Sequence, residues 1–519
     1  MTTDVRGTVV GVGETRTVST QYGERDLAEL DVRAEGDDAD TVTVTLWGKW
    51  TETAAHAREG MDLLVTGAEE TEFRGEAGYA TSGDSHVVLE PGFLVDVTDI
   101  RSWVQCPRMY YLNKLKGVPL AAPVTKGTIV HEVFGDLLRG RALEGAVEER
   151  VEDAALELGL LGESPEGMRE EVAQHAGAID GWLKQGVFAD DAEGGWGEDD
   201  WRSEYTLISP TYGIKGRADA LRGGMPVELK TGKNTNRDPR FQDKIQAACY
   251  ALLLEERGHD VNTGTLLYTK NAAVDRAEES GDLSPAKEFS LGGGLLNFVV
   301  RTRNEIAAME FDTGVPTGHE ADARCEYCFE RDACMVVAGR LDQESKAGTV
   351  GTALPEAERD YFEAVYERIE GERAFVHREY AKLWEQTPEE RVDDDRAVLG
   401  LEPAERERTD DGRWRLSAER SDAETSKLRA GDVALGSDGD PVYGERELVR
   451  IEELDAERVV VTADEPVALR RLDVYPSELS VDRMLTALHD AVLKGEPRRK
   501  DLLFDRASPE FGSEDHGLI

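Results

Sequence analysis

The chain has 519 residues, which is too long for one core, and we expect three or four domains of the usual size, ~100–200 residues each. The 106 Asp and Glu residues outnumber the 61 Lys and Arg residues and give a formal net charge of -45, and the acidic residues are spread along the whole chain. This pattern indicates adaptation to the salt-rich cytoplasm of an extreme halophile. The alternative is an ordinary acidic or partly disordered protein, but 39% hydrophobic residues and 8 Trp favour folded cores. The sequence has no signal-peptide-like apolar region and no run of ~18 apolar residues, so we expect a cytoplasmic protein without a membrane span.

Residues 1–95 are predicted to form a small antiparallel β-barrel. Short alternating stretches such as "DVRGTVVGV", "LAELDVRA" and "TVTVTLWGKW" are separated by Gly- and Asp-rich turns. The pattern resembles an OB-fold, in which Trp47 and Trp50 would stack on unpaired bases. The alternative is that both tryptophans pack in the core or against a neighbouring domain.

Residues 96–340 change to longer helical periods, as in "VTKGTIVHEVFGDLLRGRAL" and "QDKIQAACYALLLEERG". These helices surround a few strands, which predicts an α/β domain. Residues 341–410 are predicted as a helical stalk and linker, with one long helix between 355 and 387. Residues 411–478 return to strands and are predicted as a second small β-barrel, and residues 479–519 as a terminal helix and tail. The expected fold class is therefore a multidomain α/β protein.

Acidic and basic side chains converge in "GRADALRGGMPVELK", which reads as two strands joined by a Gly-Gly turn. Glu228 and Lys230 project from the same strand face, and Asp219 on the partner strand is expected beside Glu228. Two carboxylates suit a hard ion such as Mg²⁺ or Mn²⁺, and a neighbouring lysine would orient a water molecule for phosphodiester hydrolysis. The alternative is a surface ion pair on a hairpin.

Two nearby helices carry further candidates. Gln246 and Tyr250 in "QAACY" lie on one helical face and would hold either a DNA phosphate or the candidate catalytic lysine. His131 in "GTIVHEVF" would supply an imidazole ligand to the metal. Taken alone, a histidine on an apolar helix face is more often a satisfied core residue.

Together these motifs resemble the PD-(D/E)XK nuclease superfamily in its RecB-like branch. The resemblance implies a PD-(D/E)XK core in which His131, Asp219 and Glu228 bind divalent metal. It assigns catalysis to Asp219, Glu228 and Lys230, and contact with DNA to Gln246 and Tyr250. All of these positions are filled, in the family's order.

Three of the five cysteines are crowded in "CEYCFERDAC", an uneven pattern that favours a metal or cluster site over disulfides. With Cys106 they resemble the four-cysteine iron–sulfur staple of RecB-like nucleases. That resemblance implies a structural 4Fe–4S cluster on Cys106, Cys325, Cys328 and Cys334, clamping both ends of the nuclease domain. Four thiolates also suit zinc, which stays the alternative. Cys249 is expected to be a small buried hydrophobe.

The order of modules resembles the nuclease half of the replication nuclease-helicases. Because no G-x4-G-K-[ST] loop occurs, an ATPase motor is not expected, and a separately encoded helicase is the predicted partner. The implied function is cleavage of single-stranded or flap DNA in replication or repair. The alternatives are processing like that of the CRISPR-associated exonucleases, or a non-catalytic scaffold that binds single-stranded DNA.

The segment "KTGKNTNRDPRFQDK" reverses the local charge to positive. Lys233, Arg237 and Arg240 in this segment are predicted to contact DNA phosphates. The alternative is a solvated loop without a ligand.

Overall fold

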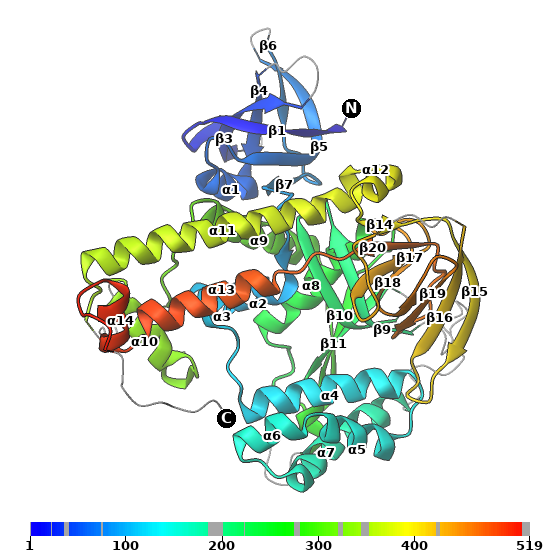
Figure 1. Ribbon diagram of the computed structural model, residues 1–519. Helices are drawn as coiled ribbons and strands as arrows, with labels where there is room; N and C mark the ends of the chain where they lie inside the picture. The colour runs from blue at the N-terminus through cyan, green and yellow to red at the C-terminus, as the bar shows by residue number, and fades with distance from the viewer. Residues whose placement is uncertain are drawn as a thin grey trace. The chain divides into compact units, whose positions relative to one another are not determined.

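The computed structural model describes residues 2–21, 23–35, 41–73, 76–184, 201–222, 224–273, 281–319, 325–343, 352–421 and 426–510 (Figure 1). The last part of the predicted tail, 511–519, lies outside these ranges. The chain divides into two compact units. Unit 1 contains 1–104, 120–311 and 377–476, and unit 2 contains 105–119, 312–376 and 477–519.

Unit 1 begins with a barrel of five strands. In the pairing order β1-β3-β4-β6-β5, β5 pairs again with β1 and closes the barrel. All neighbours are antiparallel except β4 and β6, which are parallel, so the predicted N-terminal barrel is confirmed but is not purely antiparallel. The elements of this region are β1 (Thr2–Val12), β2 (Arg16–Thr20), β3 (Gly23–Ala34), β4 (Thr41–Trp47), η1 (Gly48–Trp50), α1 (Thr51–His56), β5 (Asp62–Phe73), β6 (Glu76–Ala80) and β7 (His86–Leu89).

Trp50 lies in the interior of this region, with 0% of its surface exposed. Its ring meets the edge of His86 at a centroid distance of 6.0 Å, and His86 in turn meets Tyr212 at 5.3 Å. A ring enclosed in this way has no face for a base, so the packing alternative holds for Trp50. Trp47 is half-buried, and its predicted stacking on bases stays a prediction.

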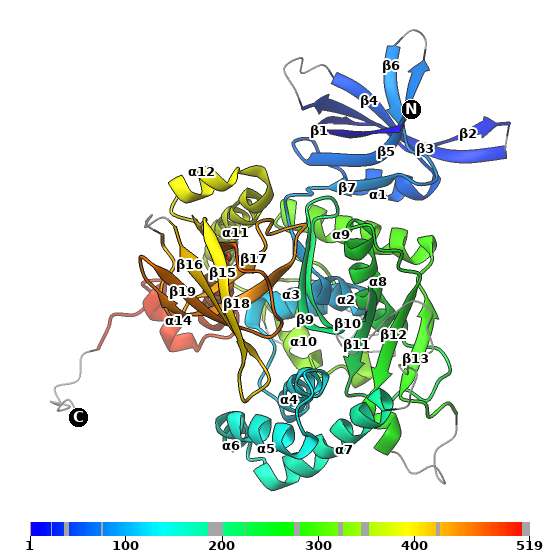
Figure 2. The ribbon, with the colours of Figure 1, turned by 90° about the vertical axis from the view of Figure 1, so that its right-hand side faces the viewer.

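The middle of unit 1 is a mixed sheet of six strands. Its order is β13-β12-β11-β10-β8, with β9 pairing to β10 (Figure 2). The pairs β8–β10 and β11–β12 are parallel and the others are antiparallel. The strands are β8 (Val95–Asp96), β9 (Trp201–Ser209), β10 (Ile214–Arg222), β11 (Met225–Lys230), β12 (Thr263–Tyr268) and β13 (Ala286–Ser290).

Helices cover this sheet. One core joins apolar residues of α4, α5, α6 and α7 to Ala220, Val227, Leu229 and Leu267 of the strands. Helix α8 packs on β10, β11 and β12, and every residue from Ile245 to Leu254 is buried, as expected for a central helix that is apolar on all sides. The helical elements are α2 (Val97–Gln105), α4 (Ala122–Leu138), α5 (Leu143–Asp153), α6 (Ala155–Leu161), α7 (Pro165–Leu183), α8 (Phe241–Glu255), η3 (Thr269–Ala273) and α9 (Gly293–Phe311).

The last part of unit 1 is an antiparallel sheet of seven strands in the order β14-β20-β17-β18-β19-β16-β15. This pairing path is open among the described residues, so closure into a barrel stays a prediction. The sheet starts inside residues 341–410, the range predicted as stalk and linker. No strand signal is present in the sequence there because edge strand β15 is almost entirely exposed and lacks apolar alternation. The elements are α12 (Pro388–Asp393), β14 (Ala397–Val398), β15 (Leu401–Arg408), β16 (Trp414–Arg420), β17 (Val433–Ser437), β18 (Arg446–Leu454), β19 (Arg458–Ala463) and β20 (Arg471–Val474).

Unit 2 is helical. The predicted long helix is confirmed as α11, which continues through Gly371 and crosses from unit 2 into unit 1 at residue 377. Inside unit 2, Lys114 pairs with Glu370 at 3.0 Å and Lys500 pairs with Glu358 at 2.6 Å. Its elements are α3 (Pro107–Lys116), η4 (Cys325–Tyr327), α10 (Arg331–Arg340), the first part of α11 (Glu356–Glu385), α13 (Leu479–Leu488), the π-helical η5 (His489–Leu493) and α14 (Pro497–Leu503).

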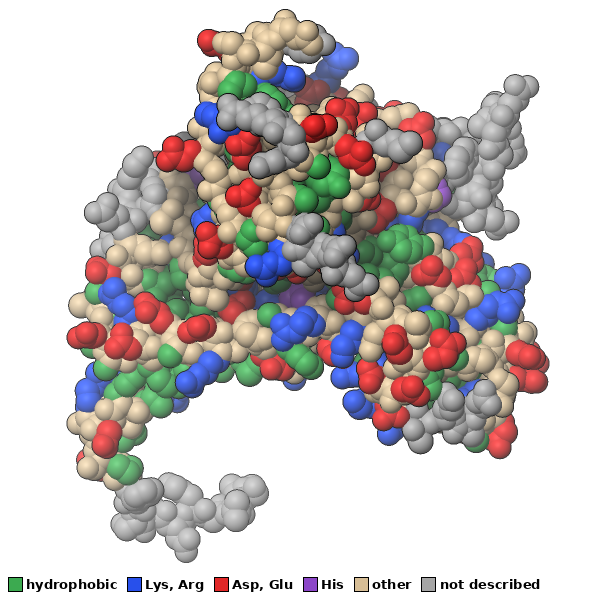
Figure 3. All heavy atoms as spheres, turned by 90° about the horizontal axis from the view of Figure 1, so that it is seen from above, with side chains coloured by type: hydrophobic (Ala, Val, Ile, Leu, Met, Phe, Trp, Pro, Cys, Tyr) green, Lys and Arg blue, Asp and Glu red, His purple; other side chains and the backbone are tan. Residues whose placement is uncertain are grey.

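Asp and Glu side chains are scattered over the face shown in Figure 3 rather than gathered in one patch, in line with acidity that runs along the whole sequence. Within the described ranges, no helix has both the length and the apolar character needed to cross a membrane.

Candidate active site and cysteine cluster

The hairpin of β10 and β11 brings the two predicted carboxylates together. Ala220 pairs with Val227, so Asp219 and Glu228 occupy the next positions along the ladder. The Leu229 backbone N–H donates to Asp219 Oδ2 at 2.8 Å and fixes this carboxylate against β11. The Asp219 side chain is 16% exposed and the Glu228 side chain 2% exposed, so the pair is sunk into the surface but open on the Asp219 side.

His131 reaches the same point from α4. Its Nδ1 donates to the Gly127 carbonyl at 2.8 Å, one helical turn earlier, which turns Nε2 toward Asp219 Oδ2 at 3.2 Å. Burial lowers the pKa of His131, but the Asp219 carboxylate and the Gly127 carbonyl outweigh it and raise this pKa to about 9. Burial raises the pKa of the Asp219 carboxyl, but the neighbouring His131 outweighs burial and holds this pKa below its usual value. The two side chains therefore form an ion pair.

Glu228 has one engaged and one free oxygen. Oε2 accepts a hydrogen bond from Lys230 Nζ at 3.1 Å, whereas Oε1 is buried without a hydrogen-bond partner among the described residues. Burial, followed by the charge of Asp219, raises the pKa of Glu228 to about 7, although Lys230 opposes this shift. A buried carboxylate oxygen without a donor is costly, which points to a cation as its missing partner.

Lys230 is held from two sides. Besides its bond to Glu228, Nζ donates to Gln246 Oε1 of α8 at 2.6 Å. Of the two roles predicted for Gln246, the geometry therefore matches holding the lysine, and its side chain is largely buried.

Tyr250 does not face solvent. It is 1% exposed, and its hydroxyl donates to the Arg217 carbonyl on β10 at 2.8 Å. Burial raises the pKa of this phenol well above its usual range. The predicted contact of Tyr250 with DNA is therefore not available in this structure, and the residue instead fixes β10 against α8.

A further acidic residue, Glu204 on β9, was missed by sequence reasoning. The β9–β10 register places it across from Asp219, and burial and the Asp219 charge raise the pKa of Glu204 to about 7. Arg217 clamps it, with Nε 2.7 Å from the Glu204 carbonyl and 3.2 Å from Oε2. Glu204 also has a positive φ of 52°, unusual for a residue other than glycine. Its only sequence signal was a glutamate in the strand that precedes the "GRAD" strand.

The basic segment after Lys230 is an ordered loop. Asn234 is buried and makes two hydrogen bonds with the Asn271 side chain. Its backbone N–H donates to Asn271 Oδ1 at 2.9 Å, and its backbone carbonyl accepts from Asn271 Nδ2 at 2.6 Å. Arg237 and Arg240 are exposed and Lys233 is half-buried. Two buried asparagines therefore anchor a loop that presents guanidinium groups to solvent next to the end of β11.

In the part of the chain that the structure describes, no three His, Cys, Asp or Glu side chains are already grouped as metal ligands. The donors nevertheless suit a hard divalent ion, because Glu228 Oε1 lacks a partner among the described residues and Asp219 Oδ2, which also accepts from the Leu229 N–H, lies 3.2 Å from His131 Nε2. The same three residues are those that the sequence predicted as metal ligands.

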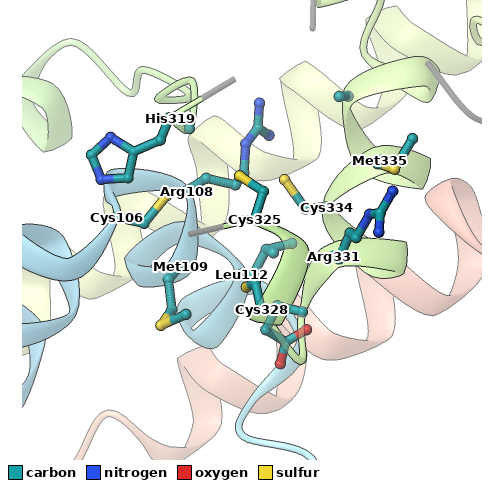
Figure 4. A pocket seen from close by; sticks show the side chains of 13 residues that line it. Cys106, Arg108, Met109, Leu112, His319, Cys325, Cys328, Arg331, Cys334 and Met335 are labelled. Carbon is teal, nitrogen blue, oxygen red and sulfur yellow. The ribbon is translucent and has the colours of Figure 1, made fainter. Parts of the chain in front are cut away.

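The four predicted cluster cysteines line one cavity of about 60 Å³ within unit 2. Figure 4 shows the sulfur atoms of Cys106, Cys325 and Cys334 directed toward a common space. All four are free thiols, burial raises the pKa of Cys334 to about 11, and burial and the neighbouring cysteines raise the pKa of Cys328. Four thiols that line one cavity would suit a metal centre, because bound metal converts thiols to thiolates. Cys249 is buried in α8, apart from this cavity, as predicted.

Comparison with known proteins places the chain near one family. Residues 35–223 match the family model described as DNA replication factor Dna2. The DNA replication ATP-dependent helicase/nuclease DNA2 of Bos taurus is 23% identical over 354 residues, which are 58% of this chain and 31% of the relative. The human protein of the same name is 22% identical over 350 residues, with the same coverage of both chains. This chain thus spans about a third of the length of the relatives it matches, and is similar to one part of them.

Proposed function

We propose that the chain is a divalent-metal-dependent DNA nuclease of the PD-(D/E)XK type that cleaves single-stranded or flap DNA in replication or repair. The observation that carries the proposal is that His131 pairs with Asp219 and Lys230 with Glu228 at one hairpin, and that the second carboxylate oxygen of Glu228 is buried with no donor among the described residues. An ordinary surface ion pair does not explain a glutamate buried to 2% exposure with one oxygen unsatisfied.

His131, Asp219 and Glu228 would hold Mg²⁺ or Mn²⁺. When bound, such an ion supplies positive charge for the scissile phosphate and lowers the pKa of a water molecule. Lys230 is placed by Gln246 and Glu228 to orient the attacking water and to offset charge on the phosphate. Tyr250 acts at a distance, because its hydrogen bond to Arg217 fixes the strand that carries Asp219.

The loop from 231 to 240 is the proposed entry for DNA. Its exposed Arg237 and Arg240 would neutralise phosphates, and the loop is anchored by Asn234 and Asn271 rather than left to fold on binding. Phosphate contacts weaken steeply with salt, so a compact patch beside the metal ligands would retain more binding in a salt-rich cytoplasm than a diffuse basic surface.

The family match supports this proposal and favours replication over CRISPR-associated processing, since the relatives are named as DNA replication helicase/nucleases. Their names include an ATP-dependent helicase, whereas this sequence has no Walker A loop. A separately encoded helicase is the proposed partner. If no helicase co-purifies with the protein or stimulates its activity in native salt, that part of the proposal fails.

The cysteine cavity of unit 2 is the proposed site of a 4Fe–4S cluster. Cys106 would be joined to Cys325, Cys328 and Cys334, which follow it by a long stretch of sequence, so a bound cluster would clamp separate segments of unit 2. We assign it a structural role, because within unit 2 these thiols line their own cavity and the proposed metal ligands belong to unit 1.

Cleavage assays on end-labelled single-stranded and flap DNA test the nuclease proposal. With Mg²⁺ or Mn²⁺ at high salt, wild-type protein is expected to cut DNA, and chelation or Glu228→Gln is expected to reduce cleavage to background. Glu288→Gln is the matched control, because Glu288 lies on β13 of the same sheet with its side chain exposed. Equal cleavage by wild type and Glu228→Gln would remove the active-site assignment.

Protein purified without oxygen is expected to show the broad visible absorbance of an iron–sulfur cluster, and Cys328→Ser is expected to lose it. Cys249→Ser is the control, since Cys249 is not part of the cavity. Colourless protein that contains one zinc per chain would instead support the zinc alternative.

A further inference from the structure

Strand β18 runs beside β9 in unit 1 (Figure 2), and residues of both strands line a second cavity. Its volume is about 400 Å³, within the range of ~300–1,000 Å³ typical of small-molecule sites. One wall comes from β9, β10 and the end of α8, and the other comes from residues 443–447 and 466–467. Tyr205 of β9, which directly follows Glu204, lines the cavity, whereas Glu204, Asp219 and Glu228 do not.

Two arginines with unused donors line this cavity. Arg446 is 1% exposed, and its Nη1 donates to the Gly444 carbonyl at 2.9 Å, but its Nε and Nη2 find no acceptor in the described part of the chain. Arg257 Nη2 donates to the carbonyls of Ile208 and Val442 at 2.7 and 2.8 Å, whereas its buried Nε likewise lacks an acceptor among the residues described. Unsatisfied buried N–H groups on charged side chains are costly, so an acceptor is expected here.

The two guanidinium groups also act on each other. Burial and then the charge of Arg446 lower the pKa of Arg257 to about 10, and burial lowers the pKa of Arg446. Like charges placed together in a poorly solvated cavity oppose folding unless an anion compensates them.

Acidic groups compensate these arginines only in part: Glu256 raises the pKa of Arg257, and Asp440 and Glu447 raise the pKa of Arg446, but burial outweighs them in both cases. Glu445 Oε1 lies 3.6 Å from Arg202 Nη2, and the Glu445 side chain is exposed, so these two charges offset each other near solvent. Glu447 is 1% exposed, with both carboxylate oxygens lacking a partner among the described residues, and burial raises its pKa well above the usual range.

We propose that this cavity binds a nucleoside 5′-phosphate, with the phosphate on Arg446 and Arg257. A phosphate presents several acceptor oxygens to the unused N–H groups, and planar guanidinium groups match it well. The cavity is much larger than one phosphate, and Leu221, Leu254 and the half-exposed ring of Tyr443 offer an apolar wall for a base and sugar. The ligand is either a free mononucleotide or the terminal nucleotide of a strand. Its nucleotide nature rests on the proposed nuclease function, whereas the anion site rests on the arginines alone.

Calorimetric titration of the full chain tests the site. The Glu228→Gln variant is used with a chelator at constant ionic strength, so that no cleavage is needed for a signal. The probes are deoxyadenosine 5′-monophosphate, deoxyadenosine, inorganic phosphate, and one oligonucleotide with and without a 5′-phosphate. We expect the monophosphate to bind more tightly than deoxyadenosine. Adding Arg446→Met or Arg257→Met is expected to weaken its binding by about 10- to 100-fold.

Arg450→Met is the matched control, because Arg450 lies on the same strand β18 with its side chain exposed and is expected to leave affinity unchanged. Arg446→Lys keeps the positive charge but loses the planar guanidinium with its paired N–H donors, so it should retain part of the affinity. Circular dichroism checks that each variant folds. Tighter binding of the 5′-phosphorylated oligonucleotide than of its unphosphorylated form identifies a strand end as ligand, and binding of the mononucleotide alone identifies the free nucleotide.

The proposal is overturned if deoxyadenosine binds as well as its monophosphate, if neither the monophosphate nor inorganic phosphate binds, or if folded Arg257→Met and Arg446→Lys proteins bind like the control. A wild-type protein that fails to cut DNA but shows the expected arginine-dependent phosphate binding would contradict the proposed nuclease function and leave the anion site standing.

Discussion

Replacing Lys230 with methionine is expected to reduce DNA cleavage by about 100- to 1,000-fold, the usual effect of removing one donor that stabilises developing charge. Methionine keeps much of the length and apolar stem of lysine but cannot donate to Glu228 or Gln246, which lie 3.1 and 2.6 Å from Nζ. Because the side chain is only 15% exposed, DNA binding should change little, so the loss is expected in kcat rather than in KM. Single-turnover cleavage at saturating DNA measures it.

Lys184→Met is the control for that experiment, since Lys184 is 73% exposed and, among the described residues, pairs with Asp180 on α7. Gln246→Leu should give a smaller loss, because Lys230 then keeps its charge and its bond to Glu228 but is held from one side. A Lys230→Met protein that cleaves like wild type would show that this lysine is structural.

Replacing Asp136 with asparagine is expected to lower the free energy of unfolding by about 3–5 kcal/mol, the usual cost of breaking a buried ionic network. Asp136 is 0% exposed, and its two oxygens accept from Arg139, Arg141 and Arg150 at distances between 2.8 and 3.0 Å. The amide cannot compensate three guanidinium groups, so their mutual repulsion remains in the folded state. Urea unfolding followed by circular dichroism measures the change.

Asp180→Asn is the matched control for Asp136, because Asp180 is half-buried and its partner Lys184, 2.7 Å away, is 73% exposed. Such pairs contribute at most about 1 kcal/mol. If Asp136→Asn were as stable as Asp180→Asn, the arginine cluster would have to be held by its packing rather than by the carboxylate.

Several features of this protein were readable from the sequence because they depend on local order. The N-terminal strands were predicted from the alternation of apolar and polar residues. Helix α8 was predicted from a continuous apolar stretch, and α11 from apolar residues repeated at helical spacing. The hairpin spacing also predicted that Asp219 and Glu228 would meet, since an antiparallel ladder fixes which residues face each other.

Other features depend on contacts between residues that are distant in the chain. Sequence reasoning left Gln246 with two roles, and only the packing of α8 on β11 placed it against Lys230 rather than at the surface. It assigned Tyr250 to DNA, whereas the closure of α8 on β10 buried the ring. Charged edge strand β15 was missed because its exposed residues carry no apolar alternation.

The sequence by itself thus indicated where strand-rich and helix-rich segments lie, the order of the candidate site residues and the four cysteines that line one cavity. Only the tertiary structure decided what each polar group is paired with: Glu204 beside Asp219, the free oxygen of Glu228, and the two arginines of the second cavity. The physical reason is that strand and helix periods arise from neighbours along the chain, whereas burial, and the partners that it demands for a charge, are set by segments brought together only in the folded protein.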